Sequence, residues 1–525
     1  MGKKKFTLQG WPKAADPTPA VGTPSKKFSA EVTARPMPPG LTVVGVGASA
    51  GGLEAFSQLL HAVPEKPGLA IVCVQHLAPR HVSVLPRLLA RTTKLPVVQV
   101  TEGILLEADH VYVIPPNVQM SVQDGTLHLA PRPDDPSQYT PINFFFRSLA
   151  ENLQGRAVGV ILSGTGSDGA VGLHDIQAAG GVTIAQDPET AQFDGMPRAA
   201  IAKGVVDLIL PAAQIGAELS RIARHPSLVA TIGVAAPDEP EVPDADLLRI
   251  FGLLRSATGV DFAHYKPGTI RRRLQRRMAL RKIAHLHDYL ALLQENSGEV
   301  SQLYQDLLID VTRFFREPGS FQSLAQNVLG KLLDERAADI LLRVWTPGCS
   351  TGEEAYSLGI AIIEHLDRQG NHVPVQIFAT DVSESAIEMA RTGLYPSTIA
   401  DDVSAERLWR FFTEVDGSYR ISKSVRDLCV FARQDRTRDP PFSRLDLIVC
   451  RNVLIDLGAA LQKKLIAVFH CALKANGFLM LGSAETTGAD GGLFSVVDKK
   501  HRLYSKRVVE TASAATSIWK PIGCS

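Results

Sequence analysis

The chain has few cysteines, almost no net charge and no long apolar run. Its six cysteines form no C-x-x-C pair and, apart from Cys524 in the tail, lie in or beside apolar runs, a pattern typical of buried thiols in a reducing compartment. A net charge of +1 excludes a global attraction to nucleic acid or acidic lipid. No apolar run reaches the length of a membrane span, and the basic start MGKKKFTLQG lacks the apolar core of a signal peptide. We therefore expect a cytoplasmic protein with no membrane insertion and no metal site.

The length of 525 residues is too great for a single core and predicts about three domains. Residues 1–40 are rich in Pro, Lys, Ala and Thr without a period, which predicts a disordered leader. Residues 226–243 gain proline and lose charge balance, which indicates a linker, and residues 509–525 are interpreted as a tail.

Apolar runs alternate with helical patterns through residues 41–225. This alternation predicts an α/β domain with a doubly wound, mostly parallel sheet. The expected strands are Val43–Val46, Leu69–Val74, Val97–Val100, His110–Ile114, Ala157–Leu162, Gly181–Ala185 and Val205–Leu210.

The second half of the chain begins with residues 244–330, where the pattern is helical and no strand is convincing. Residues 331–508 return to alternating strands and helices, which predicts a second α/β domain. Its expected strands are Ile340–Trp345, Val375–Thr380, Leu445–Cys450 and Phe478–Leu481.

A strand, a glycine-rich turn and a helix start follow one another in Leu41–Gly52, LTVVGVGASAGG, with Ser49 at the turn. Such a turn can hold a nucleophile above the carboxyl ends of a sheet, beside the unpaired N–H groups of a helix start. Gly45–Ala50 also fits the dinucleotide pattern G-x-G-x-x-G/A, which needs an acid at the end of the next strand. That strand ends in Gln75-His76 instead, so the pattern favours a nucleophile over a cofactor site.

A serine nucleophile needs a base and an acid that orients the base. His76 follows one predicted strand, and Asp168 lies in the glycine-rich turn after another, so a parallel sheet would bring both to the edge that carries Ser49. His81 is an alternative base. The backbone N–H groups around Gly164–Gly166 are candidates for an oxyanion hole.

These motifs resemble those of the CheB-type chemoreceptor methylesterase domain: GASAGG, VQHLAPRH, HVYVIPPN, SGTGSDGAVGL and TIAQDPETAQFDGMPRAAI, within residues 41–215. The resemblance implies a triad of Ser49, His76 and Asp168, with Thr165 at the oxyanion site. It further implies hydrolysis of γ-glutamyl methyl esters on receptor helices and, in many members, deamidation of glutamine. Family enzymes usually carry an N-terminal receiver domain, which 40 disordered residues cannot make, so we expect no phosphorylation control in cis.

A second strand–glycine turn–helix unit spans Thr346–Glu354, and the next strand ends in Asp381, an acid suited to ribose hydroxyls. Neither G-x-G-x-x-G nor a P-loop lysine is present to hold phosphates. The pair Glu353-Glu354 would repel a pyrophosphate and suits a sulfonium cation, although two solvated glutamates at a helix start remain an alternative.

The second half is similar to the CheR-type chemoreceptor glutamate methyltransferase. The motifs are YKPGTIRRRLQRRM, DVTRFFREP, WTPGCSTGEEAYSL, FATDVSESAIEMA, DPPFSRLDLIVCRNVLI and ANGFLMLGSAE, within residues 245–507. The resemblance implies an all-α N-terminal subdomain (244–330) and a class I, Rossmann-like S-adenosylmethionine fold (331–508). It also implies cofactor contacts by Arg316, Glu353 and Asp381, and it places Arg451 where the methyl-accepting carboxylate approaches.

Two positions depart from that family. Asp435 stands where the family usually has Asn, at a place associated with cofactor contact. Asp456 stands where CRNVLIY normally ends in Tyr near the reaction centre. A carboxylate there should repel an incoming glutamate or raise one pKa, which predicts weakened or altered transfer. An active methylesterase fused to a degenerate methyltransferase, serving as a ligand-binding or scaffold module, is therefore the alternative to a bifunctional enzyme.

The basic segment Arg271–Lys282 places Arg273, Arg276 and Arg277 on one side of a helix. We interpret this face as a docking surface for acidic receptor helices, with Arg273 and Arg277 as substrate-binding residues. A merely solvated face is the alternative. Nucleic acid is disfavoured because no aromatic interleaving or binding motif accompanies the arginines.

Overall fold

The computed structural model describes residues 40–77, 83–133, 139–225, 244–308, 312–333, 340–488 and 492–508. The expected linker and tail, all but the last residue of the expected leader, and His81 lie outside these ranges. Among the described helices, none combines the length and the apolar character that crossing a membrane requires.

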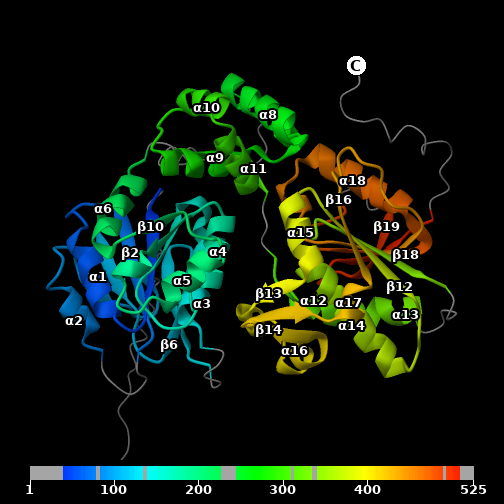
Figure 1. The fold of residues 1–525 in the computed structure, drawn as a ribbon, viewed down its shortest axis with the longest axis horizontal. Helices are drawn as coiled ribbons and strands as arrows, with labels where there is room; N and C mark the ends of the chain where they lie inside the picture. The colour runs from blue at the N-terminus through cyan, green and yellow to red at the C-terminus, as the bar shows by residue number, and fades with distance from the viewer. Residues whose placement is uncertain are drawn as a thin grey trace, which may run out of the picture. The chain divides into compact units, whose positions relative to one another are not determined.

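A seven-stranded parallel sheet forms the centre of the first domain (Figure 1). Its order is β10-β9-β8-β1-β2-β5-β3, so β1 lies between β8 and β2, where the strand order reverses direction. The strands are β1 (Thr42–Ala48), β2 (Leu69–Gln75), β3 (Val97–Gln99), β5 (His110–Val113), β8 (Ala157–Ile161), β9 (Val182–Gln186) and β10 (Leu208–Leu210). All seven were predicted from the apolar runs.

A small antiparallel sheet adjoins this domain and was not predicted. Its order is β4-β7-β6, with β4 (Ile104–Leu105), β6 (Val118–Gln123) and β7 (Thr126–Pro131). The β6–β7 hairpin turns at Asp124 and Gly125, both at positive φ.

Helices cover both faces of the parallel sheet. The core on one face includes residues of α1 (Gly52–His61), α2 (Leu85–Leu89) and α6 (Ala212–Ala223). The core on the other face includes residues of α3 (Pro141–Leu153), α4 (Ala170–Ala178) and α5 (Gly195–Ala202).

Glycines in the central strand let α3 approach it closely. A Cβ at Gly47 would lie 2.4 Å from the Ile142 side chain, and one at Gly45 would lie 2.8 Å from Phe146. Distances this short exclude a side chain at either position without movement of α3.

Four helices follow as a separate subdomain with a core of its own. They are α8 (Ala245–Thr258), α9 (Pro267–Arg281), α10 (Leu286–Glu295) and α11 (Ser297–Leu307). Side-chain caps begin two of them: Asp244 accepts from the N–H of Asp246, and Asn296 accepts from that of Glu299. The helical prediction for this region is confirmed.

The last domain is a second seven-stranded sheet in the order β16-β12-β11-β17-β18-β20-β19. Its strands are β11 (Leu342–Pro347), β12 (Val375–Asp381), β16 (Cys429–Arg433), β17 (Leu445–Cys450), β18 (Leu473–Leu481), β19 (Phe494–Asp498) and β20 (Leu503–Lys506). The pairs are parallel from β16 through β18, whereas β20 runs antiparallel to both of its neighbours. This is the predicted Rossmann-like arrangement with an antiparallel end.

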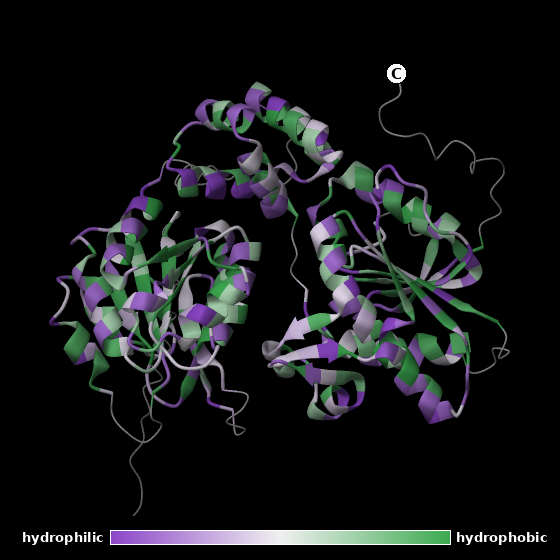
Figure 2. Ribbon diagram, in the orientation of Figure 1, coloured by the Kyte–Doolittle hydropathy of each residue, from purple (hydrophilic) through white to green (hydrophobic). Residues whose placement is uncertain are grey.

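Helices α14 (Glu353–Gln369), α15 (Glu384–Thr392) and α18 (Ala459–Ala472) connect the strands of this sheet. A three-stranded antiparallel sheet in the order β13-β15-β14 is inserted after α15, with β13 (Leu394–Pro396), β14 (Phe412–Val415) and β15 (Ser418–Ile421). Figure 2 shows apolar residues concentrated on the strands of the large sheets and hydrophilic residues on the outer sides of the helices. Each large sheet is therefore the centre of its own core.

Two candidate active sites

The first candidate site lies at the β1–α1 turn. Ala48, the last residue of β1, is paired with Gln75, the last residue of β2, so Ser49 and His76 follow directly from neighbouring strand ends. The Ser49 N–H donates to Ser163 O over 3.0 Å, which ties the turn to the segment after β8. Gly51 has φ 71°, and a Cβ there would lie 2.6 Å from Ser163 Oγ, so the turn requires glycine at this position.

His76 and Asp168 meet at this edge: His76 Nε2 lies 3.1 Å from Asp168 Oδ2. The N–H groups of Ile142 and Asn143, at the start of α3, donate to the Asp168 carboxylate over 3.0 and 2.9 Å and hold it in place. His76 Nδ1 is buried and has no hydrogen-bond partner among the described residues. The structure therefore brings together the imidazole and the carboxylate that the sequence placed at one sheet edge, and it leaves one ring nitrogen unused.

The expected oxyanion segment is only partly available. The Gly164 N–H donates to Phe193 O over 2.9 Å, so this group, which was among the candidate donors, is already used. Thr165 and Gly166 are exposed, and within the described residues no hydrogen bond from their N–H groups is found. The candidate donors are thereby reduced to these two groups.

The second candidate site lies at the β11–α14 turn. Gly348, Ser350 and Gly352 all have positive φ, and the N–H groups of Gly348 and Cys349 donate to Thr380 O at the end of β12. Asp381 accepts from the N–H groups of Ser350 and Ser383, each over 3.0 Å. The acid that the sequence placed after β12 is thus fixed beside the turn by two backbone donors.

A cavity opens at the carboxyl ends of β11, β12 and β17. Three of the predicted site residues line it: Arg316, Asp381 and Arg451. Glu353 and Asp435, expected to contact the cofactor, do not.

Of the glutamate pair, it is Glu354 that faces the cavity, where it accepts from Arg451 Nη1 over 3.0 Å. Glu353 accepts instead from Thr351 Oγ1 over 2.6 Å. Burial raises the pKa of both carboxyl groups. Successive residues of a helix point about 100° apart, so only one of the two can face the cavity, and the sequence motif did not indicate which.

Asp435, like Glu353, was expected to contact the cofactor but does not line the cavity. Its Oδ1 accepts from the N–H and Oγ1 of Thr437, and its Oδ2 is buried without a partner among the described residues. The next residue, Arg436, lines the cavity, and its Nη1 is buried and unpartnered within the same ranges.

Arg451, expected to meet the methyl-accepting carboxylate, is already paired. Its side chain is 1% exposed; Nη2 donates to Glu317 Oε2 over 2.9 Å and to Arg316 O over 2.8 Å, and Nη1 donates to Glu354. Its Nε has no partner among the described residues. In this structure Arg451 joins Glu354 of the cavity wall to Glu317, and its role toward a substrate remains a prediction.

Asp456 also lines the cavity, and Thr269 Oγ1 from α9 lies 3.4 Å from its Oδ1. Burial raises the pKa of this carboxyl group, and the nearby Arg273, Arg272 and Lys266 oppose that shift. The position at which a tyrosine was expected thus carries a carboxyl group with an increased tendency to be neutral.

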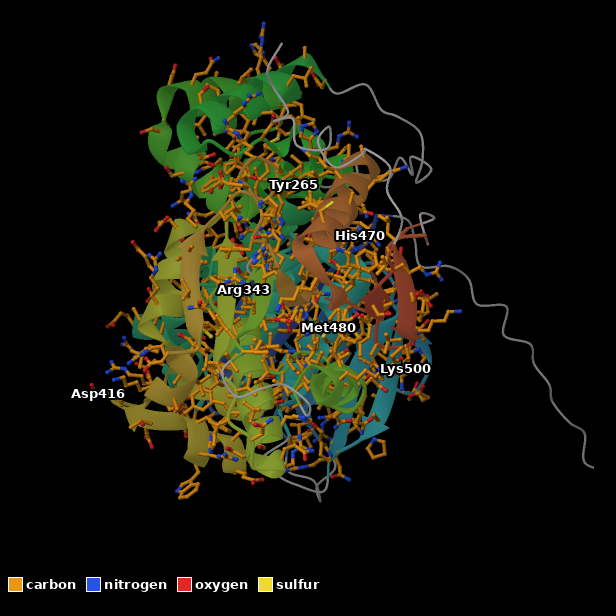
Figure 3. All side chains as sticks on the ribbon, turned by 90° about the vertical axis from the view of Figure 1, so that its right-hand side faces the viewer. Tyr265, Arg343, Asp416, His470, Met480 and Lys500 are labelled. Carbon is orange, nitrogen blue, oxygen red and sulfur yellow. The ribbon has the colours of Figure 1, made fainter. Side chains whose placement is uncertain are left out.

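Besides Arg436, the sequence analysis missed Tyr265 and Glu485. Tyr265, which is labelled in Figure 3, lines the cavity from the helical subdomain. Burial raises its pKa to about 12, and its backbone bridges to Leu457. Glu485 is buried and accepts from the backbone N–H groups that follow Arg451 and β18, namely those of Asn452, Val453, Leu454 and Gly482. Tyr265 and Glu485 both stand in quoted motifs, YKPGT and GSAE, but no spacing rule pointed to them.

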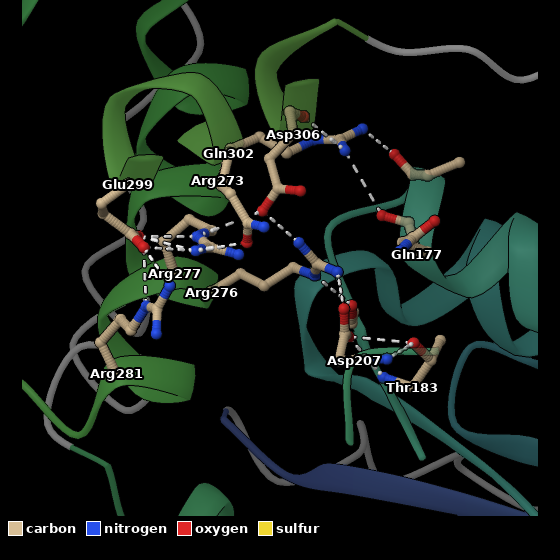
Figure 4. A network of polar contacts seen from close by, with 12 residues as sticks. Gln177, Thr183, Asp207, Arg273, Arg276, Arg277, Arg281, Glu299, Gln302 and Asp306 are labelled. Atoms are coloured by element: carbon tan, nitrogen blue, oxygen red, sulfur yellow. Dashed lines mark hydrogen bonds and ion pairs between the residues drawn. The ribbon is translucent and has the colours of Figure 1, made fainter. Parts of the chain in front are cut away.

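Arg273 and Arg277 do not form the open face expected for receptor docking. Both are buried, Arg273 at 5% and Arg277 at 7% exposure, and both are engaged by other parts of the chain (Figure 4). Arg277 pairs with Glu299 over 2.7 Å, and Arg273 donates to Asp306 O over 2.9 Å. The expectation is corrected because the helix packs its arginines against neighbouring elements rather than against solvent.

The cavity suits a ligand that combines cationic, anionic and hydroxyl groups. Its wall offers carboxylates from Glu354 and Asp381, and Arg436 Nη1 and Asn452 Oδ1 are buried polar atoms without partners among the described residues. A Cβ at Gly348 would lie 2.4 Å from both Arg436 Nη1 and Val453 Cγ2, so glycine leaves room at the turn. S-adenosylmethionine, with its sulfonium, amino acid and ribose groups, fits this set of donors and acceptors.

Three protein-family models match the chain. The CheB methylesterase model matches residues 44–219, the all-alpha domain of CheR methyltransferase matches residues 245–308, and the S-adenosylmethionine-binding domain of CheR methyltransferase matches residues 310–503.

Several relatives share one or both halves of this arrangement. An uncharacterized 104.1 kDa protein of Rhodobacter capsulatus is 42% identical over 435 residues, which cover 79% of this chain and 46% of that protein. A protein-glutamate methylesterase/protein-glutamine glutaminase of Burkholderia orbicola is 40% identical over 35% of this chain and 54% of its own. A chemotaxis protein methyltransferase of Vibrio cholerae is 26% identical over 49% of this chain and 91% of its own. The chain therefore spans about half the length of the first two relatives.

Among solved structures, the CheB methylesterase catalytic domain of Thermotoga maritima matches 35% of this chain and 98% of its own length, with 29% identity and a TM-score of 0.33. The family assignment rests on the three models and the sequence relatives. The chain accordingly joins a CheB methylesterase domain to the all-α and S-adenosylmethionine-binding domains of a CheR methyltransferase, as its motifs predicted.

Proposed function

We propose that this protein is a bifunctional chemotaxis enzyme that acts in the cytoplasm on glutamates of chemoreceptor helices. The methylesterase domain would remove methyl groups from γ-glutamyl esters, and the methyltransferase domains would add them from S-adenosylmethionine. The observation that carries the proposal is the 3.1 Å contact between His76 and Asp168 beside the Ser49 turn.

In the esterase reaction, Ser49 Oγ attacks the ester carbonyl carbon while His76 takes its proton. Asp168 Oδ2 holds His76 through Nε2, so we assign the unpartnered Nδ1 as the base. The N–H groups of Thr165 and Gly166 are candidates to stabilise the oxyanion. Methanol leaves with the proton from His76, and water then releases the glutamate from Ser49 by the same steps.

The same site can act on a glutamine side chain. An amide carbonyl carbon accepts the same nucleophile, and ammonia would then leave in place of methanol. Release of ammonia from unmodified receptor, dependent on Ser49, would be the evidence for this second reaction.

In the transferase reaction, bound S-adenosylmethionine supplies an electrophilic methyl group on a sulfonium centre. The chain's contribution is alignment, because a glutamate carboxylate is already a nucleophile. We assign Asp381 to the ribose hydroxyls, and its support is that it lines the cavity together with the charged residues Glu354 and Arg316. Tyr265 and Asp456 are the residues that we expect nearest to the acceptor.

The second candidate function is a methyltransferase half that binds ligand without turnover. Asp456 favours it, since an ionised carboxylate in the cavity would repel an incoming glutamate. The increased pKa of Asp456 weakens this objection, because a neutral carboxyl group can donate a hydrogen bond to the acceptor instead.

The experiment that tests both activities follows methyl uptake and methanol release in one reaction. The full chain is incubated with receptor cytoplasmic fragments and S-adenosylmethionine that carries a labelled methyl group. We expect Ser49→Ala to stop methanol release and leave methyl uptake unchanged. We expect Asp381→Asn to stop methyl uptake, while methanol release from receptor fragments that are already methylated continues. Calorimetric binding of S-adenosylmethionine without any methyl uptake would support the non-catalytic alternative for the second half.

A further inference from the structure

Four of the arginines of α9 fall into two sets with different partners (Figure 4). Arg277 and Arg281 pair with Glu299 of α11, inside the helical subdomain. Arg273 and Arg276 reach out of that subdomain to the methylesterase domain. One helix therefore has an inward set and an outward set of guanidinium groups.

Arg276 is the most enclosed of the four, with its side chain 1% exposed. It forms ion pairs with Asp207 of the methylesterase domain and with Asp306 of the helical subdomain, and its Nε donates to Gly181 O over 2.9 Å. Asp207 is itself fixed, because its Oδ2 accepts from the N–H and Oγ1 of Thr183 over 2.9 Å each. A buried cation thus bridges one carboxylate from each side of the contact.

Arg273 completes the contact at the end of α4. It donates to Ala178 O and, over 3.4 Å, to Gln177 O, both in the last turn of that helix. The last carbonyl groups of a helix have no partner within it and carry partial negative charge, so a guanidinium group is a favourable neighbour there.

An apolar contact accompanies these polar ones. Ala279 of α9 is fully buried and belongs to the core that includes α1 and α6, and Arg221 of α6 donates to Ala279 O over 3.0 Å. The contact therefore has an apolar part, a buried ion pair and satisfied backbone groups, as a specific interface requires.

We propose that the methylesterase domain covers the Arg273/Arg276 face of α9. An acidic partner segment would then reach these arginines only by displacing Asp207 and the α4 carbonyl groups. Carboxylates of an acidic helix or peptide are chemically equivalent to Asp207, so the two would compete for Arg276. Access to this face would then require separation of the two domains. The proposal does not depend on either catalytic activity.

The first test measures the compactness of the full chain by sedimentation velocity and small-angle X-ray scattering. We expect Asp207→Asn and Arg276→Met to increase the radius of gyration and lower the sedimentation coefficient, because each removes one side of the buried pair. Arg281→Met is the matched control: it alters an arginine of the same helix whose ion-pair partner, among the described residues, is Glu299 alone. Far-UV circular dichroism verifies that every variant is folded.

The second test uses a fluorescein-labelled poly-L-glutamate peptide and measures fluorescence anisotropy at low ionic strength. We expect Asp207→Asn to bind the peptide about tenfold more tightly than the unmodified chain, because it frees Arg276 from a competitor. Adding Arg273→Met and Arg276→Met to Asp207→Asn should remove the gain. Equal compactness and equal peptide affinity of Asp207→Asn and the unmodified chain would overturn the proposal.

Discussion

The two catalytic domains use the same local device, a strand, a glycine turn and a helix start, for different chemistry. At the β1–α1 turn the device presents Ser49, and the neighbouring strand β2 is followed by His76. At the β11–α14 turn the neighbouring strand β12 ends in Asp381, which accepts from the N–H of Ser350 in that turn. The residue at the end of the adjacent parallel strand therefore differs between the proposed nucleophile site and the proposed cofactor site.

The two sites also differ in how their carboxylates are held. Asp168 accepts from two N–H groups at the start of α3 and contacts an imidazole, whereas Glu354 shares a buried arginine with Glu317. The first arrangement would suit the orientation of a proton acceptor, as proposed for His76, and the second balances charge around a cavity. The variants below test this distinction, beginning with the largest expected effect.

Ser49→Ala should lower methanol release from methylated receptor by about 10⁴-fold or more, because the reaction loses its nucleophile. Methyl transfer by the same preparation should be unchanged. Ser57→Ala, in α1, is the matched control, since Ser57 Oγ donates only to Leu53 O of its own helix. Methanol release by Ser49→Ala at the unmodified rate would contradict the assignment of Ser49 as the nucleophile.

Asp168→Asn should lower methanol release by about 10³ to 10⁴-fold, because an amide does not hold His76 in the required tautomer. Asp187→Asn is the control: Asp187 follows β9 and caps the N–H of Glu189 without contacting His76. Full activity of Asp168→Asn would show that the 3.1 Å contact has no catalytic role.

Asp381→Asn should weaken binding of S-adenosylmethionine by about 10 to 100-fold, as expected for loss of charged hydrogen bonds. Isothermal titration calorimetry measures this directly, without a receptor substrate. Asp367→Asn, which removes a half-exposed ion pair with Arg410 at the end of α14, should leave the affinity unchanged. If both variants bind S-adenosylmethionine with the same affinity, Asp381 does not contribute to the cofactor site. The comparison between the end of β2 and the end of β12 would then be wrong.

Asp456→Asn should have the smallest effect, a change in the pH dependence of stability. Because burial raises the folded-state pKa of Asp456, its contribution is fully present below the ordinary aspartate pKa and is lost as pH rises through the raised value. Relative to the unmodified chain, the variant should therefore gain thermal stability from pH 4 to pH 8. Melting temperatures by differential scanning fluorimetry across this range provide the measurement.

The pKa of Asp498 is shifted in the opposite direction to that of Asp456. Hydrogen bonds from Ser323 and His501 lower its pKa, so its contribution is present above the ordinary aspartate pKa and is lost as pH falls. Asp498→Asn should differ most from the unmodified chain near neutral pH and converge with it in acid. If the melting temperatures of both variants, relative to the unmodified chain, changed with pH in the same direction, the assigned pKa shifts would be contradicted.

The long central strands could be predicted because each is a continuous apolar run covered on both faces. The strands that were missed, such as β16 and β20, lie at or near the edge of the sheet and carry mixed polarity. The insertion β13-β15-β14 was missed for the same reason: short antiparallel strands with one exposed face give a weak pattern.

The candidate site residues also differ in how well the sequence could predict them. Ser49, His76, Asp168 and Asp381 stand at strand ends or in the turns that follow, where parallel topology fixes the edge they reach. Glu354 and Arg436 line the cavity while their predicted neighbours Glu353 and Asp435 do not, because helix rotation and loop conformation select the inward residue.

By itself, the sequence determined the order of the domains, the parallel sheets and the strand ends at which the candidate site residues lie. These features depend on apolar runs and glycine turns, which are local along the chain. Only the tertiary structure decided what surrounds the arginines of α9. Their charge predicted an open face, but packing buried Arg276 between Asp207 and Asp306, and contacts between residues so distant in the chain leave no local pattern.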